Sequence, residues 1–216
     1  MNCRSRDVRK QIVELYDLEV ITYSIILNGR EKKSCTGDIL TDQYYEFLCK
    51  LKSDNKKTRI ITCGYTAGEH FLQLCNLDKP KIFNPLIDNE INYENNRNNI
   101  GNTRDNTQEA CKWNILAYEL YIALNWLSIC WDKPLIGHLL EKKINIKNNP
   151  TEEPSESVIR AVNTSIGKGK RSLTEMINEI RKDNEIREYT FNYLNVYIEK
   201  LNENIENEGK KIKSFF

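Results

Sequence analysis

The chain has 216 residues, of which 39% are hydrophobic and 29% are charged, and its formal net charge is +1. This length allows one or two domains and is ample for a buried core. The hydrophobic fraction excludes a fully disordered chain. The near-neutral charge excludes a strongly basic protein of the kind that coats nucleic acid or a membrane surface.

Three features of the sequence bear on its location. No apolar segment follows residues 1–7, so we expect no secretory signal. The longest apolar stretch, residues 110–131, contains charged and amide side chains and predicts a buried helix rather than a membrane span. The cysteines are odd in number and without a C-x-x-C pair, at positions 3, 35, 49, 63, 75, 111 and 130. They predict reduced thiols in a cytoplasmic protein that does not bind membranes.

The N-terminal segment predicts a helix followed by strands. Ser5 is expected to cap a short helix. The alternation of apolar and polar residues in 19–27 predicts a strand. Asn28-Gly29 then favours a tight hairpin turn into a polar return strand over residues 30–35.

The following segment continues the mixture of helices and strands. Apolar residues at helical spacing predict a helix over residues 41–51, and residues 59–63 indicate a short buried strand. Thr66 and Glu69 have the spacing of a capping box, which predicts that a helix starts there. A last short strand is expected at residues 81–83.

These elements predict the α+β class. We expect a small mixed sheet with covering helices in residues 1–87 and an all-helical bundle in residues 108–216. The intervening residues 88–107 are polar and Asn-rich and lack an apolar pattern. They predict a long loop or a domain boundary.

The C-terminal part predicts four helices. The first, over residues 108–131, is apolar nearly all round, which is typical of a central helix. Three amphipathic helices follow, and the second of them opens with a capping box at Ser172 and Glu175. The last has heptad-like spacing from Phe191 to Ile205, which suits a bundle or a coiled coil. We favour the bundle.

A cysteine and a histidine flank the predicted start of the helix at residue 66. Cys63 ends a strand just before the helix N-terminus, where the helix dipole and free N–H groups lower a thiol pKa. His70 would be the base of a Cys-dependent enzyme acting on a phosphate or acyl group. Because His70 lies in the second helical turn, we favour the alternative of a buried cysteine and a partly exposed histidine.

The same region offers ligands for zinc. Structural zinc takes four soft ligands, which Cys35, Cys63, His70 and Cys75 would supply. The C-x-x-C spacing typical of such sites is missing, and Cys75 suits the apolar face of its helix equally well. No other cofactor is expected.

A glycine-rich basic turn occurs at residues 167–172. Its Lys168, Lys170 and Arg171 stand before a helix N-terminus, a position that attracts the phosphates of nucleic acid or of a nucleotide. The turn is not a Walker A motif, and the alternative is a solvated connection between helices.

Aromatic residues gather on the predicted 108–131 helix at too many angles for one neighbour to bury. They are Trp113, Tyr118, Tyr121, Trp126 and Trp131. Tyrosine and tryptophan contribute most to the free energy of protein interfaces, so these residues are candidates for an interface; core packing is the alternative.

These observations favour a non-catalytic cytoplasmic binding protein that acts on another protein or on a second copy of itself. Asparagine makes up about 12% of the chain, as is typical of AT-rich coding, which suits an accessory protein of a phage or other mobile element. Two alternatives stay open. One is a nucleic-acid-binding protein that uses the basic turn and a zinc site, and the other is an enzyme centred on Cys63.

Overall fold

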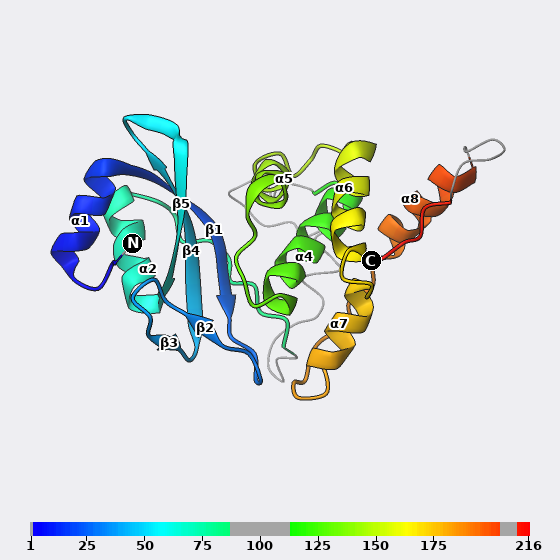
Figure 1. Ribbon diagram of the computed structural model, residues 1–216, viewed down its shortest axis with the longest axis horizontal. Coiled ribbons are helices and arrows are strands. Elements are labelled where there is room, and N and C mark those ends of the chain that lie inside the picture. The colour runs from blue at the N-terminus through cyan, green and yellow to red at the C-terminus, as the bar shows by residue number, and fades with distance from the viewer. Residues whose placement is uncertain (1, 87–112, 204–210) are drawn as a thin grey trace, which may run out of the picture. The chain divides into compact units, whose positions relative to one another are not determined.

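The computed structural model describes residues 2–86, 113–203 and 211–216 (Figure 1). The chain divides into two compact units. Unit 1 comprises Met1–Pro85 and Trp131–Pro134, and unit 2 comprises Leu86–Cys130 and Leu135–Phe216. The predicted polar boundary at residues 88–107 lies outside the described residues. The α+β class is confirmed, because a small antiparallel sheet with helices is followed by a run of helices.

Unit 1 is built from two helices and a three-stranded sheet. Its elements are α1 (Arg6–Leu15), β1 (Tyr16–Ile25), β2 (Lys32–Lys33), β3 (Ile39–Leu40), β4 (Gln43–Leu51), β5 (Asp54–Gly64) and α2 (Tyr65–Cys75). The sheet has the order β1-β4-β5 with antiparallel pairing throughout, and β2 and β3 form a separate two-stranded ribbon. A bulge lies between Val20 and Thr22 of β1.

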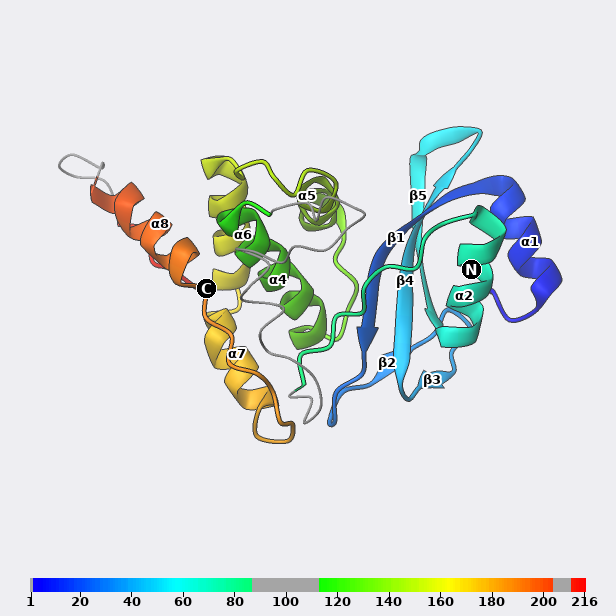
Figure 2. The same ribbon diagram turned by 180° about the vertical axis from the view of Figure 1, so that it is seen from behind.

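Both helices of unit 1 cover the same face of the sheet, as the front and back views show (Figures 1 and 2). Between them and the strands lies an aromatic core. The Tyr23 and Tyr45 rings stack with centroids 4.1 Å apart, and Phe47 contacts Phe71 at 5.4 Å. Burial of these large rings supplies much of the driving force for folding of the unit.

The predicted helix at residues 41–51 is wrong, because this segment forms β4. Its apolar residues have helical spacing, but Tyr44, Tyr45, Phe47 and Leu48 are all buried in the central strand of the sheet. A strand that is buried on both faces loses the polar–apolar alternation that identifies strands. The abundance of aromatic residues, which favour strands, is the signal that was available.

The predicted hairpin at Asn28-Gly29 is also wrong. The chain does turn there, with Gly29 at φ +75°. However, β1 pairs with β4, and Lys32–Lys33 pairs with Ile39–Leu40 instead of returning along β1. Residues 81–83 contribute one parallel bridge between Phe83 and Ser24 rather than a strand.

The start of α2 differs from the predicted capping box. The N-cap is Gly64, without a side-chain hydrogen bond, and Glu69 binds a residue of the sheet instead. By contrast, Ser5 caps α1 as predicted, since its Oγ accepts a hydrogen bond from the Val8 N–H at 3.2 Å.

The described part of unit 2 is helical. Its helices are α4 (Ile115–Cys130), α5 (Gly137–Asn148), α6 (Glu156–Gly167), α7 (Leu173–Ile180) and α8 (Asn192–Glu203). Helix α5 was not predicted from the sequence. The capping box of α7 is confirmed, because Ser172 Oγ accepts from the Glu175 N–H and Glu175 Oε2 accepts from the Ser172 N–H.

Helix α4 is central in unit 2, as predicted, and contacts α5, α7 and α8. It begins at Ile115, where Asn114 Oδ1 accepts hydrogen bonds from the Leu116 and Ala117 N–H groups. Of the heptad-like residues, Leu194 and Ile198 are fully buried, and Ile205 lies outside the described residues. Leu194 and Ile198 are therefore used inside the unit, as expected for a bundle and not for an intermolecular coiled coil.

Candidate functional site

The thiol of Cys63 is inaccessible. Cys63 lies next to last in β5, and only 1% of the residue is exposed. Burial raises the pKa of its thiol well above the usual range. A nucleophile needs the opposite shift and an open approach, so the predicted acidification of Cys63 is wrong.

His70 is engaged by an arginine rather than by Cys63. The buried Arg9 of α1 donates from Nε to His70 Nδ1 at 2.9 Å. Its Nη1 also donates to the carbonyl oxygens of Cys3 and Arg4, at 2.7 and 2.9 Å. Burial and then the Arg9 charge lower the pKa of His70, which keeps the ring neutral at physiological pH. Arg9 therefore holds α1, α2 and the N-terminal segment together.

The predicted zinc ligands do not form a metal site. Within residues 2–86, 113–203 and 211–216 there is no group of three or more His, Cys, Asp or Glu side chains that could hold a metal ion. Cys35, Cys63, His70 and Cys75 lie in the same unit, but they do not converge as four ligands. All six described cysteines are free thiols.

A network that the sequence did not reveal involves Glu69, the neighbour of His70 in α2. Tyr45 donates its hydroxyl to Glu69 Oε1 at 2.5 Å, and Lys79 Nζ lies 3.1 Å from the same oxygen. The Lys79 ammonium also lies 4.7 Å from the centroid of the Tyr65 ring and 5.4 Å from that of Tyr23. Burial opposes ionisation of Glu69, but the hydrogen bonds from Tyr45 and Lys79 lower its pKa overall. This network anchors the segment after α2 to the sheet.

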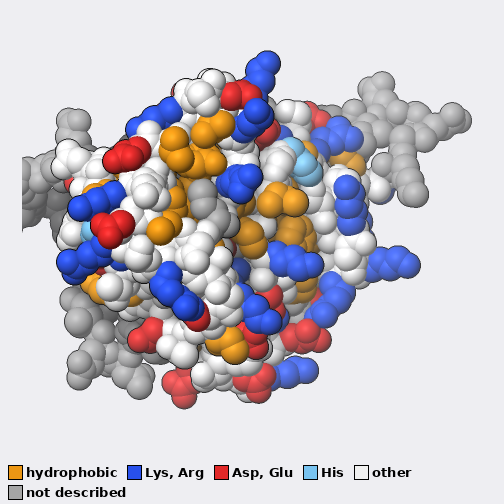
Figure 3. Space-filling model, turned by 60° about the vertical axis from the view of Figure 1, so that its left-hand side comes forward, with side chains coloured by type: hydrophobic (Ala, Val, Ile, Leu, Met, Phe, Trp, Pro, Cys, Tyr) orange, Lys and Arg blue, Asp and Glu red, His pale blue; other side chains and the backbone are white. Residues whose placement is uncertain are grey.

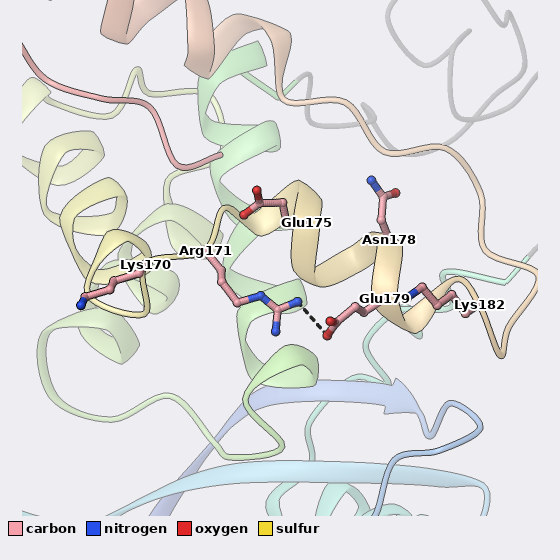
Figure 4. Close-up of a pocket in the computed structure, with 6 residues that line it drawn as sticks. All are labelled: Lys170, Arg171, Glu175, Asn178, Glu179 and Lys182. Carbon is pink, nitrogen blue, oxygen red and sulfur yellow. Dashed lines mark ion pairs between the residues drawn. The ribbon is translucent and has the colours of Figure 1, made fainter.

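The basic turn is partly neutralised. It borders a shallow surface pocket, shown in Figure 4, that is lined by Lys170, Arg171, Glu175, Asn178, Glu179 and Lys182. Arg171 reaches toward Glu179 and pairs with it at 2.7 Å, while Lys170 points away. Glu175 and Ser172 satisfy each other's backbone N–H groups at the start of α7.

Of the three predicted basic residues, Lys168 and Lys170 are exposed, and neither takes part in the Arg171–Glu179 ion pair. On the face shown in Figure 3, lysine and arginine side chains are interspersed with aspartate and glutamate around hydrophobic patches. Neither observation favours a nucleic-acid site over a solvated turn. The nucleic-acid site at Lys168, Lys170 and Arg171 therefore stays a prediction.

The predicted interface aromatics divide into three groups. Trp126 is fully buried and packs edge to face against Tyr189, so it belongs to the core of unit 2. Trp131 lies beyond the end of α4, in the short segment that belongs to unit 1. Trp113, Tyr118 and Tyr121 form the remaining group, at the start of α4, where the Trp113 ring contacts both tyrosine rings.

Tyr118 is 40% exposed and lies near the start of α8. The adjacent Glu119 accepts hydrogen bonds from the backbone N–H groups of Tyr193 and Leu194, at 3.3 and 2.9 Å. Glu119 therefore caps α8 from a different helix, an arrangement that local sequence patterns cannot predict. Burial raises the pKa of Glu119, and the two hydrogen bonds oppose this shift.

The exposed side of α8 carries further aromatic and apolar residues. Tyr193 is 52% exposed and Val196 is 45% exposed, and Tyr197 follows at helical spacing. We call Tyr118, Tyr193, Val196 and Tyr197 the α8 face. Arg187 lies near Tyr118, where its charge opposes the rise in the tyrosine pKa that burial causes. Glu156 and Glu153 lie near Tyr197, where burial and then their charges raise the pKa.

Comparison with known families covers almost the whole chain. A family model described as uncharacterised conserved protein UCP028583 matches residues 1–208. The chain belongs to this family. Curated proteins and solved structures gave no match to the chain. Among the described residues, no helix of the chain has both the length and the apolar character that crossing a membrane requires.

Proposed function

We propose that the protein acts by binding another protein through the α8 face, and that the partner is a second copy of the chain. The observation that carries this proposal is the exposure of Tyr193 and Val196 on α8 and of Tyr118, whose neighbour Glu119 caps that helix. Exposed tyrosines presented by rigid helices are the side chains that protein interfaces use most.

The charges around the α8 face favour a second copy as the partner. Arg187 lies near Tyr118, and Glu153 lies near Tyr197 together with Glu156, which also pairs with Arg160 at 2.8 Å. Two copies related by a twofold axis would place their α8 helices antiparallel. The basic end of one face would then meet the acidic end of the other, as a self-complementary interface requires.

Sedimentation velocity over a concentration series tests this proposal. Interfaces below about 1,200 Å² are typical of weak complexes, so we expect dimers to accumulate above about 10 μM protein. The double variant Tyr193→Ala/Val196→Ala should weaken dimerisation at least about tenfold, the effect of removing one interface anchor.

Ile136→Ala is the matched control, because Ile136 is an apolar residue of unit 2 that is 71% exposed and lies outside the α8 face. This control should dimerise like the unchanged protein. A protein that stays monomeric at the highest soluble concentration would contradict the proposal, as would a dimer that the double variant leaves unaffected.

A further inference from the structure

Two cysteines that are distant in sequence meet in unit 1. Cys3 precedes α1, and Cys35 lies in the turn between β2 and β3. Cys3 belongs to the buried core cluster of unit 1, Cys35 packs against that cluster, and the two side chains interact through a hydrogen bond. Cys3 is only 3% exposed, whereas Cys35 is partly exposed. One thiol of the pair is therefore accessible and the other is protected.

The two segments are fixed by contacts on both sides of the thiols. Arg4, next to Cys3, binds both carboxylate oxygens of Asp38 in the Cys35 turn, at 2.7 and 2.9 Å. The Cys35 N–H donates to the Thr62 carbonyl of β5 at 2.8 Å. On the other side, Arg9 Nη1 donates to the Cys3 carbonyl at 2.7 Å. The pair is thus held together by charge-assisted bonds and by the sheet.

The turn that carries Cys35 is itself well ordered by hydrogen bonds. Ser34 Oγ accepts from the N–H groups of Thr36 and Asp38, at 3.2 and 3.1 Å. The Ser34 N–H donates to the Asp38 carbonyl at 2.8 Å, which closes the turn. These bonds fix the backbone on both sides of Cys35.

The environment of the pair also separates the roles of the two thiols. The hydrogen bond from Cys3 lowers the pKa of Cys35 to about 7, although burial opposes the shift. The same hydrogen bond, followed by burial, raises the pKa of Cys3. Cys35 is therefore the more readily deprotonated of the two thiols.

We propose that Cys3 and Cys35 form a reversible dithiol–disulfide site that reacts with low-molecular-weight disulfides such as oxidised glutathione. Cys35 is the attacking residue and Cys3 the resolving residue. This inference concerns unit 1 alone and does not depend on the α8 face.

The reaction proceeds by two exchanges. The Cys35 thiolate attacks one sulfur of oxidised glutathione, forms a mixed disulfide and expels the first glutathione as a thiolate. Cys3 then loses its proton to solvent and attacks the Cys35 sulfur, which expels the second glutathione thiolate. The two protein thiols are oxidised to one disulfide and one glutathione disulfide is reduced to two thiols. The two protons released by the protein are taken up by the glutathione thiolates.

Mass spectrometry of the full chain tests the site. The reduced protein is treated with oxidised glutathione at pH 7, its remaining thiols are blocked with N-ethylmaleimide, and the digest is searched for linked peptides. We expect a Cys3–Cys35 disulfide. The Cys3→Ser variant should instead accumulate glutathione on Cys35, and Cys35→Ser should form neither product.

Cys75→Ser is the matched control, because Cys75 is also partly exposed in unit 1 but burial raises its pKa. It should behave like the unchanged protein. Disulfides that join other cysteine pairs, or a Cys35 that remains unmodified, would overturn the proposal.

A second measurement follows the reactivity of Cys35 and starts with the unchanged protein. The rate of Cys35 alkylation by iodoacetamide should be half-maximal near pH 7. In Cys3→Ala, which removes the donor, the midpoint should rise toward the usual cysteine value of about 8.5. A midpoint that is alkaline in the unchanged protein would count against Cys35 as the attacking residue.

Discussion

The two units of this protein differ in where their long-range polar contacts lie. In unit 1 such contacts join helices and sheet, as in Arg9 with His70 and Tyr45 with Glu69, and the cap of α1 at Ser5 is local. In unit 2 the caps of α4 and α7 are local, made by Asn114 and by Ser172 with Glu175. Its long-range contacts are the Glu119 cap of α8 and the bonds of the buried Asn163 to the backbone of Lys213 and Phe215. Local caps are visible in a sequence, whereas long-range pairs appear only after folding.

The two proposed activities depend on different kinds of contact. The dithiol in unit 1 depends on a turn and an N-terminal segment that ion pairs bring together. The α8 face in unit 2 depends on a helix whose apolar side is already used by the core. If long-range contacts hold unit 1 more firmly, a substitution there should lower the free energy of unfolding more than a matched substitution in unit 2.

The largest effect is expected for Gly68→Ala in unit 1. An added methyl group would collide with the ring of Tyr45, which is fully buried and stacked on Tyr23. Overpacking of this kind costs about 1–3 kcal/mol, and the better helix propensity of alanine offsets up to about 1 kcal/mol. We expect the free energy of unfolding, measured in urea, to fall by about 2 kcal/mol.

Gly167→Ala in unit 2 is the partner experiment. Its methyl group would meet the ring of Phe215, which is only partly buried and has more room to move. We expect a loss below about 1 kcal/mol. Equal losses for the two variants would contradict the expectation that such a substitution destabilises the protein more in unit 1.

The next largest effect is expected for Tyr45→Phe. This change removes the hydrogen bond to Glu69 and leaves the ring in place. Hydrogen bonds to charged groups contribute about 1.5–3 kcal/mol, so we expect a loss near the lower limit because Lys79 still pairs with Glu69. Tyr23→Phe, which removes a bond to the neutral Gln43, should cost less. A larger loss for Tyr23→Phe than for Tyr45→Phe would contradict this ranking.

The long-range cap of α8 predicts a smaller effect. Glu119→Ala removes both acceptors at the start of α8 and should cost about 1 kcal/mol, as other N-cap deletions do. Glu119→Gln keeps one acceptor oxygen. Because burial raises the Glu119 pKa in the folded state, unfolding releases protons and stability falls as the pH rises through the range above the usual carboxyl value.

Thermal unfolding between pH 4 and pH 7 measures this dependence. The Gln variant should lose less stability over the range than the unchanged protein does. A pH dependence that is identical in the two proteins would show that Glu119 does not titrate as its burial requires.

The smallest effect is expected from the titration of His70. Its pKa is lowered in the folded protein, so the unfolded chain binds the proton more tightly. The stabilisation is complete above the usual histidine pKa and is lost as the pH falls below it. His70→Asn keeps an acceptor near the Nδ1 position but does not titrate. The melting temperature of the unchanged protein should therefore fall more than that of the variant between pH 7 and pH 5.

The sequence predicted those parts of the fold that local patterns determine. Ser5 and the Ser172–Glu175 box mark helix starts because the bonds join residues three positions apart. Tyr44 and Tyr45 were misassigned because the central strand is buried on both faces and shows no alternation. Arg9 gave no signal, since its three acceptors are identified only when α1 packs on α2.

The candidate sites follow the same division. The sequence identified Tyr118 as a surface aromatic, but it did not reveal that α8 starts beside it, because the Glu119 cap spans more than 70 residues. It also directed attention to Cys63, which burial makes inert, and not to the pair of Cys3 and Cys35. Contacts between distant segments determine both where α8 starts and which cysteines are buried.

The central claim, that a second copy binds at the α8 face, is tested most directly by photo-crosslinking. A benzophenone amino acid is placed at position 193, and in a control protein at the exposed position 168 on the basic turn. We predict a cross-linked dimer for position 193 only, with the attachment in α4 or α8 of the second copy. The absence of a dimer, or equal cross-linking from both positions, would contradict it.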